Sequence, residues 1–68
     1  MNVDNIVMFS DNGHYAKWFF GRFAKVVHYT PVGDDGCAHC RVEWLTPVKY
    51  HNQLTTISDF SADKFTVC

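Results

Sequence analysis

Two apolar, β-branched stretches on either side of a turn-rich segment dominate the pattern of hydrophobic and polar positions. FAKVVHY (residues 23–29) and CRVEWL (residues 40–45) flank a segment that carries Pro31, Gly33 and Gly36. Such residues favour a pleated sheet in the arms and a turn between them, so the pattern predicts a β-hairpin. The second arm alternates cleanly, which predicts that one face is buried: Ala38, Cys40, Val42 and Trp44. In the first arm, the face of Ala24 and Val26 opposes that of Phe23 and Lys25. Trp44 is the first choice for a core residue.

The remaining elements follow from shorter patterns. Residues 5–9, 54–57 and 64–68 are predicted strands, and Pro47 predicts a bulge or a sheet edge because it donates no ladder hydrogen bond. Residues 15–23 fit neither the helical nor the strand period, and we expect a long loop there, bent at Gly21. Residues 58–63 predict one short helical or 3₁₀ turn, with Ser58 as its cap.

Composition narrows the class of protein. The chain has 68 residues, 47% of them apolar and 16% aromatic, which is enough for one domain over residues 1–68 with a real core and no metal or disulfide. Three cysteines, an odd number, predict reduced thiols. No apolar run reaches the roughly 20 residues that cross a bilayer, and no signal peptide is evident. We therefore expect a cytoplasmic protein, in the host cytoplasm if it is viral, with no membrane partner.

The order of elements resembles that of an SH3-like small β-barrel of the KOW/Tudor type. The resemblance rests on the succession of strands, on V-x-W within CRVEWL and on the opening DNIVMF, although Asn5 stands where such domains commonly carry an acidic residue or a Gly-Asp pair. It implies an all-β, five-stranded barrel with a long first loop and one 3₁₀ turn before the last strand. The stretches EWLTPV and ISDFSADKF also resemble small accessory proteins of tailed bacteriophages, a likeness that carries no activity.

Aromatic and basic residues interleave in the first loop, HYAKWFFGR (residues 14–22). Rings in such a loop can fill a partner's pockets while cations pair with carboxylate or phosphate, and the resemblance implies that this loop helps to form a ligand groove. The predicted partner contacts are Tyr15, Lys17, Trp18, Phe19 and Arg22. In the structural alternative, Phe20 and Phe23 belong to the core and the other residues cover the open end of the barrel.

A second set of candidates concerns nucleic acid. Lys17, Arg22, Lys25 and Arg41 are the candidate contacts to DNA or RNA. The formal net charge of −1 argues against this function, since nucleic-acid modules usually carry a basic excess. Glu43 shares a strand face with Arg41, so a solvated strand face is the alternative.

The sharpest local motif is Cys37-Ala-His-Cys40. Zinc needs about four sulfur or nitrogen ligands, and strand alternation would turn Cys37 and Cys40 to opposite faces, so these two are weak metal candidates. Asp34-Asp35-Gly36 predicts turn chemistry rather than calcium binding. We expect no cofactor and no catalytic residue, because no orienting group or oxyanion loop accompanies a cysteine–histidine pair.

These observations predict a non-enzymatic binding module. The leading hypothesis is a small phage-type protein that binds and modulates a host or viral protein through its aromatic first loop, with one sheet edge accepting a partner strand. A KOW/Tudor-like module that binds nucleic acid is the alternative, and a zinc-stabilised module is the third. The expected assembly is a monomer or an edge-paired dimer.

Overall fold

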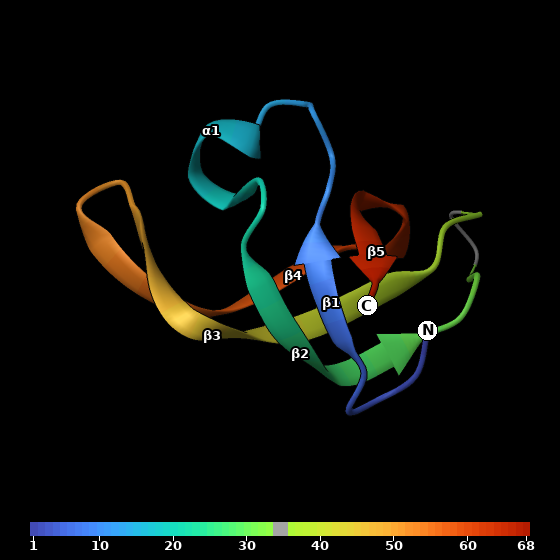
Figure 1. Ribbon diagram of the computed structural model, residues 1–68. Coiled ribbons are helices and arrows are strands. Elements are labelled where there is room, and N and C mark those ends of the chain that lie inside the picture. Colours follow the sequence, from blue (N-terminus) through green and yellow to red (C-terminus); the bar gives the residue numbers. More distant parts are fainter. Residues whose placement is uncertain (34–35) are drawn as a thin grey trace.

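The computed structural model describes residues 1–33 and 36–68 (Figure 1). The described elements in chain order are β1 (Ile6–Phe9), α1 (Ala16–Phe19), β2 (Phe23–Thr30), β3 (His39–Tyr50), β4 (Gln53–Ser61), the 3₁₀ turn η1 (Ala62–Lys64) and β5 (Phe65–Val67). The chain is therefore mostly β, as the sequence predicts.

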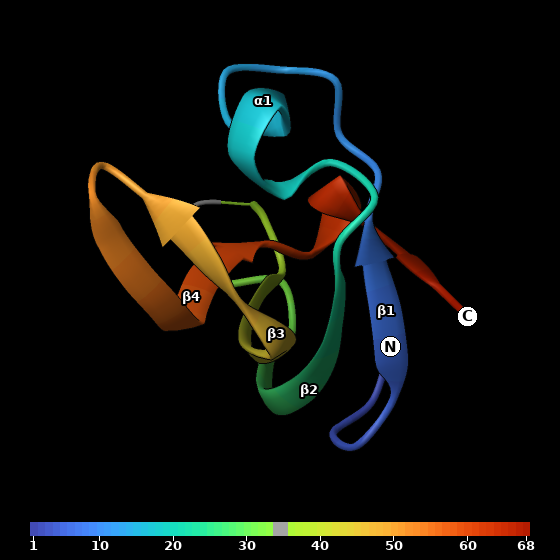
Figure 2. The same cartoon turned by 60° about the vertical axis from the view of Figure 1, so that its left-hand side comes forward.

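The five strands form one antiparallel sheet in the order β4-β3-β2-β1-β5. Because β4 and β5 stand at opposite ends of this order, the sheet over the described ranges is open rather than a closed barrel. Figures 1 and 2 show the sheet bending, with α1 lying over the side between β1 and the β3–β4 hairpin. No helix in the described ranges is both long and apolar enough to span a membrane.

The central hairpin of β2 and β3 confirms the predicted pairing. Ala24 lies opposite Trp44 and Val26 opposite Val42, and all four side chains are buried. A shift in register between Val26 and His28 then offsets the end of β2. The turn predicted at Asp34-Asp35 lies outside the described residues.

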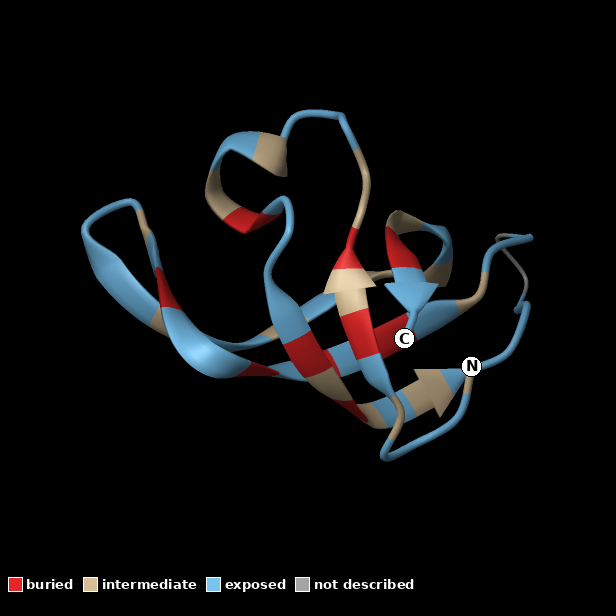
Figure 3. Cartoon of the chain, viewed as in Figure 1, coloured by how far each residue is buried: buried red, intermediate tan, exposed pale blue. Residues whose placement is uncertain are grey.

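The core lies on one side of the curved sheet and consists of Val7, Phe9, Phe19, Ala24, Val26, Cys40, Val42, Trp44, Val48 and Phe65. Phe9 is fully buried and its ring lies near those of Phe19, Phe60 and Phe65. Figure 3 shows the buried positions on α1, β1, β2, β3 and β5. No charged or polar residue in the described ranges is buried, so apolar packing supplies the stabilisation here.

The first loop corrects two predictions. Residues 16–19 form one helical turn, closed by the hydrogen bond from the N–H of Phe20 to the carbonyl of Ala16 at 2.9 Å. Gly21 then takes a φ of 79°, which supports the predicted bend because glycine adopts positive φ without steric cost. The structural alternative placed Phe20 and Phe23 in the core, and this is wrong: they are 52% and 47% exposed. Phe23 faces outward because its neighbour Ala24 faces inward.

The predicted turn over residues 58–63 is also wrong in position. Strand β4 continues to Ser61, and the 3₁₀ turn before the last strand is the shorter η1. Ser58 does not cap it; its hydroxyl accepts a hydrogen bond from the indole N–H of Trp44 at 3.0 Å. This bond and the ladder to β3 hold Ser58 in the strand.

The far end of the β3–β4 hairpin departs from regular pairing. The register shifts between Glu43 and Val48, the stretch that contains Pro47, where the sequence predicts a bulge or a sheet edge. The hairpin then closes between Tyr50 and Gln53, with His51 and Asn52 at φ values of 49° and 64°. Two consecutive left-handed residues are typical of the tight turns that match the twist of a hairpin.

Candidate partner-binding site

Two rings of the first loop, those of Tyr15 and Trp18, pack against the end of the β3–β4 hairpin. Ring centroids of Trp18 and Tyr50 are 4.7 Å apart, and those of Trp18 and His51 are 5.1 Å apart. The Lys17 ammonium lies 4.6 Å from the centroid of the Trp18 ring, within cation–π range. We name the residues Tyr15, Lys17, Trp18, Tyr50 and His51 the α1 surface. It joins partly exposed rings and a cation on one side of the molecule.

Phe19 does not belong to this surface, although the sequence predicts it as a partner contact. Its side chain is only 2% exposed, and its ring stacks on Trp44 with centroids 4.9 Å apart and planes 15° apart. Since Trp18 precedes Phe19 in the same helical turn, the buried ring anchors the partly exposed one. Phe19 thus positions the α1 surface from the core.

A groove of about 330 Å³ adjoins the α1 surface between α1 and β4. Its aromatic lining comes from Tyr15, Phe19, Tyr50 and Phe60, and β4 also contributes Thr55, Ser58 and Asp59. We name it the β4 groove. Aromatic walls with a few polar groups can hold an apolar side chain and fix its orientation.

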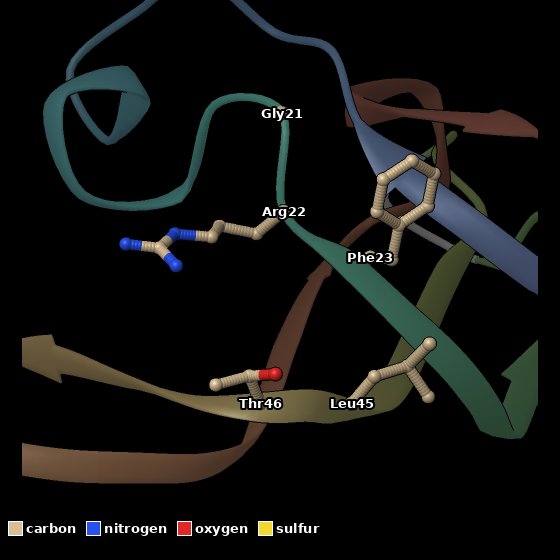
Figure 4. Close-up of a pocket in the computed structure, with 5 residues that line it drawn as sticks. All are labelled: Gly21, Arg22, Phe23, Leu45 and Thr46. Atoms are coloured by element: carbon tan, nitrogen blue, oxygen red, sulfur yellow. The ribbon is translucent and has the colours of Figure 1, made fainter.

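Arg22, the remaining predicted partner contact, lines a different hollow. This outer hollow measures about 280 Å³ and is lined by Gly21, Arg22, Phe23, Leu45 and Thr46. In Figure 4, Arg22 directly precedes β2, and its side chain extends away from the Phe23 ring. Of the five predicted partner contacts, three therefore belong to the α1 surface, Phe19 lies in the core and Arg22 lines the outer hollow.

Two of the four candidate nucleic-acid residues have acidic neighbours. Arg41 forms an ion pair with Asp59, from Nε to Oδ1 at 2.9 Å, and this hydrogen bond raises the pKa of Arg41. Lys25 lies opposite Glu43 in the sheet. Acidic neighbours therefore offset two of the four predicted cations.

The Cys37-x-x-Cys40 motif straddles the boundary of the core. Cys40 is buried and Cys37 is exposed, in agreement with the predicted alternation. Burial raises the pKa of the Cys40 thiol to about 11, with the charge of Asp59 adding to the effect. Within residues 1–33 and 36–68, no group of three or more histidine, cysteine or acidic side chains is arranged to hold a metal ion.

Sequence reasoning missed the contributions of Tyr50, His51 and Phe60. The hairpin turn brings Tyr50 and His51 under α1, and the longer β4 places Phe60 in the groove. The signal available in the sequence was His51-Asn52, a pair compatible with left-handed turn residues. This pair indicates where the hairpin turns, but it does not indicate which residues pack against the turn.

A search of known protein families, curated proteins and solved structures found no match to this chain. The resemblance to SH3-like domains and to tailed-phage accessory proteins therefore stays a prediction.

Proposed function

We propose that this chain is a non-enzymatic binding module that captures a partner protein through the α1 surface, and that its open sheet is a variant of the SH3-like architecture. Support for the architecture comes from the meander of β1 to β4, the return of β5 to β1 and the 3₁₀ turn before β5. A host or viral protein is the partner class that the phage likeness suggests.

The main support for the proposed function is a cluster of partly exposed aromatic rings that pack against one another. Trp18 packs edge-on against Tyr50, and Tyr15 packs on Phe60 with centroids 5.2 Å apart. Large rings held in place before binding are typical hot-spot residues, since little side-chain entropy is lost when a partner covers them. Phe19 in the core keeps the cluster in position.

The test is a tagged pull-down from the source cell or its host, with and without nuclease, read by mass spectrometry. Trp18→Ala should abolish recovery of the partner while the circular dichroism spectrum stays that of the parent. Phe20→Ala is the matched control: this ring is 52% exposed, lies two residues away and lacks the contacts of Trp18. Equal recovery of the partner by both variants would show that the α1 surface does not bind it.

One contact favours nucleic acid as a second candidate. Lys17 over Trp18 combines a cation with a ring on which a base could stack. If this function holds, recovery should collapse with nuclease, and affinity for a labelled oligonucleotide should fall steeply with salt. Lys17→Glu combined with Arg22→Glu should then abolish binding. Zinc stabilisation, the third hypothesis, predicts metal in the purified protein and unfolding on chelation.

A further inference from the structure

The two edges of the sheet are unequal. Strand β5 has three residues, whereas β4 has nine and pairs only with β3 in the sheet order. An edge strand presents alternate N–H and C=O groups away from its neighbour, and proteins usually blunt such edges with lysine, proline or a very short strand. The β4 sequence QLTTISDFS contains no lysine, arginine or proline. The edge at β5 is short, whereas β4 is long and Asp59 is its single charged residue.

The β4 groove lies beside this edge. Thr55, Ser58, Asp59 and Phe60 of β4 line it, and the rings of the first loop and of Tyr50 form its other walls. A strand added to β4 would turn alternate side chains toward the concave side of the sheet. One of those side chains would enter the groove, so that main-chain hydrogen bonds and an aromatic pocket act on the same ligand.

The charge beside the edge selects the ligand further. Asp59 borders the groove, and its carboxylate lies next to Arg41 on the face of β4 opposite to that of Ser58 and Phe60, where the other side chains of an added strand would lie. The carboxylate is paired with Arg41, but the two side chains are 64% and 55% exposed, and an ion pair so open to water is weak. A cation on the ligand can therefore share or replace Arg41 at Asp59.

We propose that the β4 edge accepts an extended segment of a partner protein by strand addition, with an apolar side chain in the β4 groove and a lysine or arginine beside Asp59. This inference rests on the proposed function, because Tyr15 and Tyr50 belong to both the α1 surface and the groove. It names the binding mode and the chemistry of the ligand.

The first test selects binders for the immobilised full chain from a displayed library of random twelve-residue peptides. The expected consensus alternates β-branched or apolar residues with polar ones and includes lysine or arginine. The enriched peptide is then synthesised with N-methyl groups on alternate amides, in both phases. One phase should lose at least tenfold in affinity, since N-methylation removes the donors that a β-strand needs. A proline-rich or acidic consensus, equal binding of both methylated forms, or no enrichment would overturn the proposal.

The second test changes the charge on the outer face of the β4 edge. Asp59→Asn should weaken the enriched peptide by about threefold, and Arg41→Gln should tighten it, because the carboxylate then loses its internal competitor. Asp63→Asn is the matched control, an exposed acidic residue of η1 outside the groove, and should leave affinity unchanged. The proposal requires that the two variants change peptide affinity in opposite directions. Weaker binding by both variants would contradict the assigned role of Asp59.

Two outcomes separate this inference from the function on which it rests. If Trp18-dependent capture persists while no peptide binds, the binding module stands and strand addition at β4 is wrong. If sedimentation of the chain alone shows a dimer that Ile57→Lys dissociates, a second copy occupies the edge and the peptide ligand is wrong. Ile57 lies within β4 and is 51% exposed.

Discussion

At the scale of single residues, Trp44 joins the core to β4. Its ring stacks on Phe19, and its indole N–H reaches the Ser58 hydroxyl at 3.0 Å. The alternation of CRVEWL was enough to predict that Trp44 is buried, because a strand with one buried face places every second residue there. No comparable period existed in the first loop, so the sequence could not tell that Phe19 is buried and Phe20 exposed.

Removing the ring of Trp44 should be costly. Trp44→Ala should lower the free energy of unfolding by about 3–5 kcal/mol, as expected for deleting a large buried ring. Chemical denaturation monitored by circular dichroism measures this. A loss below about 1 kcal/mol would contradict the placement of Trp44 in the core.

The Trp44–Ser58 hydrogen bond has a smaller, separable contribution. Ser58→Ala should lower the free energy of unfolding by about 1 kcal/mol, since the indole donor loses its partner in a partly buried site. Trp44→Phe removes the donor instead, and the double variant should cost less than the sum of the two single changes. Strict additivity in that double-mutant cycle would show that the bond is not formed in solution.

The buried thiol of Cys40 should make the stability of the folded protein depend on pH in the alkaline range. Its pKa of about 11 exceeds the value of 9.0 for a free thiol, so the folded state holds this proton more tightly than the unfolded state. Its contribution to stability should be complete below pH 9 and disappear as pH rises toward 11. Cys40→Ala should flatten that part of a plot of stability against pH. At pH 8, Ellman's reagent should react with Cys37 and Cys68 in the folded protein and with Cys40 only after unfolding.

At the scale of elements, the β3–β4 hairpin supplies both the unpaired sheet edge at β4 and part of the lining of the β4 groove. The sequence predicted strands over residues 40–45 and 54–57 but ended the second at residue 57, because Ser58 and Asp59 are frequent at helix starts. Tertiary contacts overrode that local preference: the Trp44 indole holds Ser58, and the ladder with β3 pairs Asp59 with Arg41. These partners lie 14 and 18 positions away, beyond the reach of local pattern.

The turn of this hairpin can be tested through Asn52, whose φ is 64°. Asn52→Ala should lower the free energy of unfolding by about 1 kcal/mol, because a Cβ without a local hydrogen-bonding group disfavours the left-handed region. Asn52→Gly, the matched control, should cost less, since glycine adopts this conformation freely. Thermal or chemical denaturation compares the two, and an equal loss would contradict the left-handed turn.

At the scale of the whole molecule, β5 and η1 close one end of the sheet. Lys64 accepts hydrogen bonds at its carbonyl from the N–H groups of Ser10 and Asp11, and its ammonium lies 3.4 Å from the Asp11 carboxylate. Phe65 then packs edge-on against Phe9. The succession of strands along the chain, a short turn before the last strand and the main hairpin were predictable, whereas the position of that turn and the shape of the groove depend on long-range packing that no local pattern encodes.

Deleting the Phe65 ring should therefore destabilise the whole molecule. Phe65→Ala should lower the free energy of unfolding by about 3 kcal/mol and shift every spectroscopic probe together. Val67→Ala, in the same short strand but 47% exposed, should cost much less. A local loss of signal at β5 with the rest of the spectrum unchanged would show that this strand is not part of the cooperative unit.

The stacking of Phe19 on Trp44 also has a kinetic consequence. Because this contact anchors the helical turn in the folded chain, we expect the neighbouring ring of Trp18 to need no rearrangement before a ligand binds. Association should then follow simple second-order kinetics, with an observed rate that rises linearly with ligand concentration and reaches no plateau. Phe19→Leu, which weakens the stack but keeps an apolar side chain, should introduce such a plateau by making the ordering of α1 a separate step.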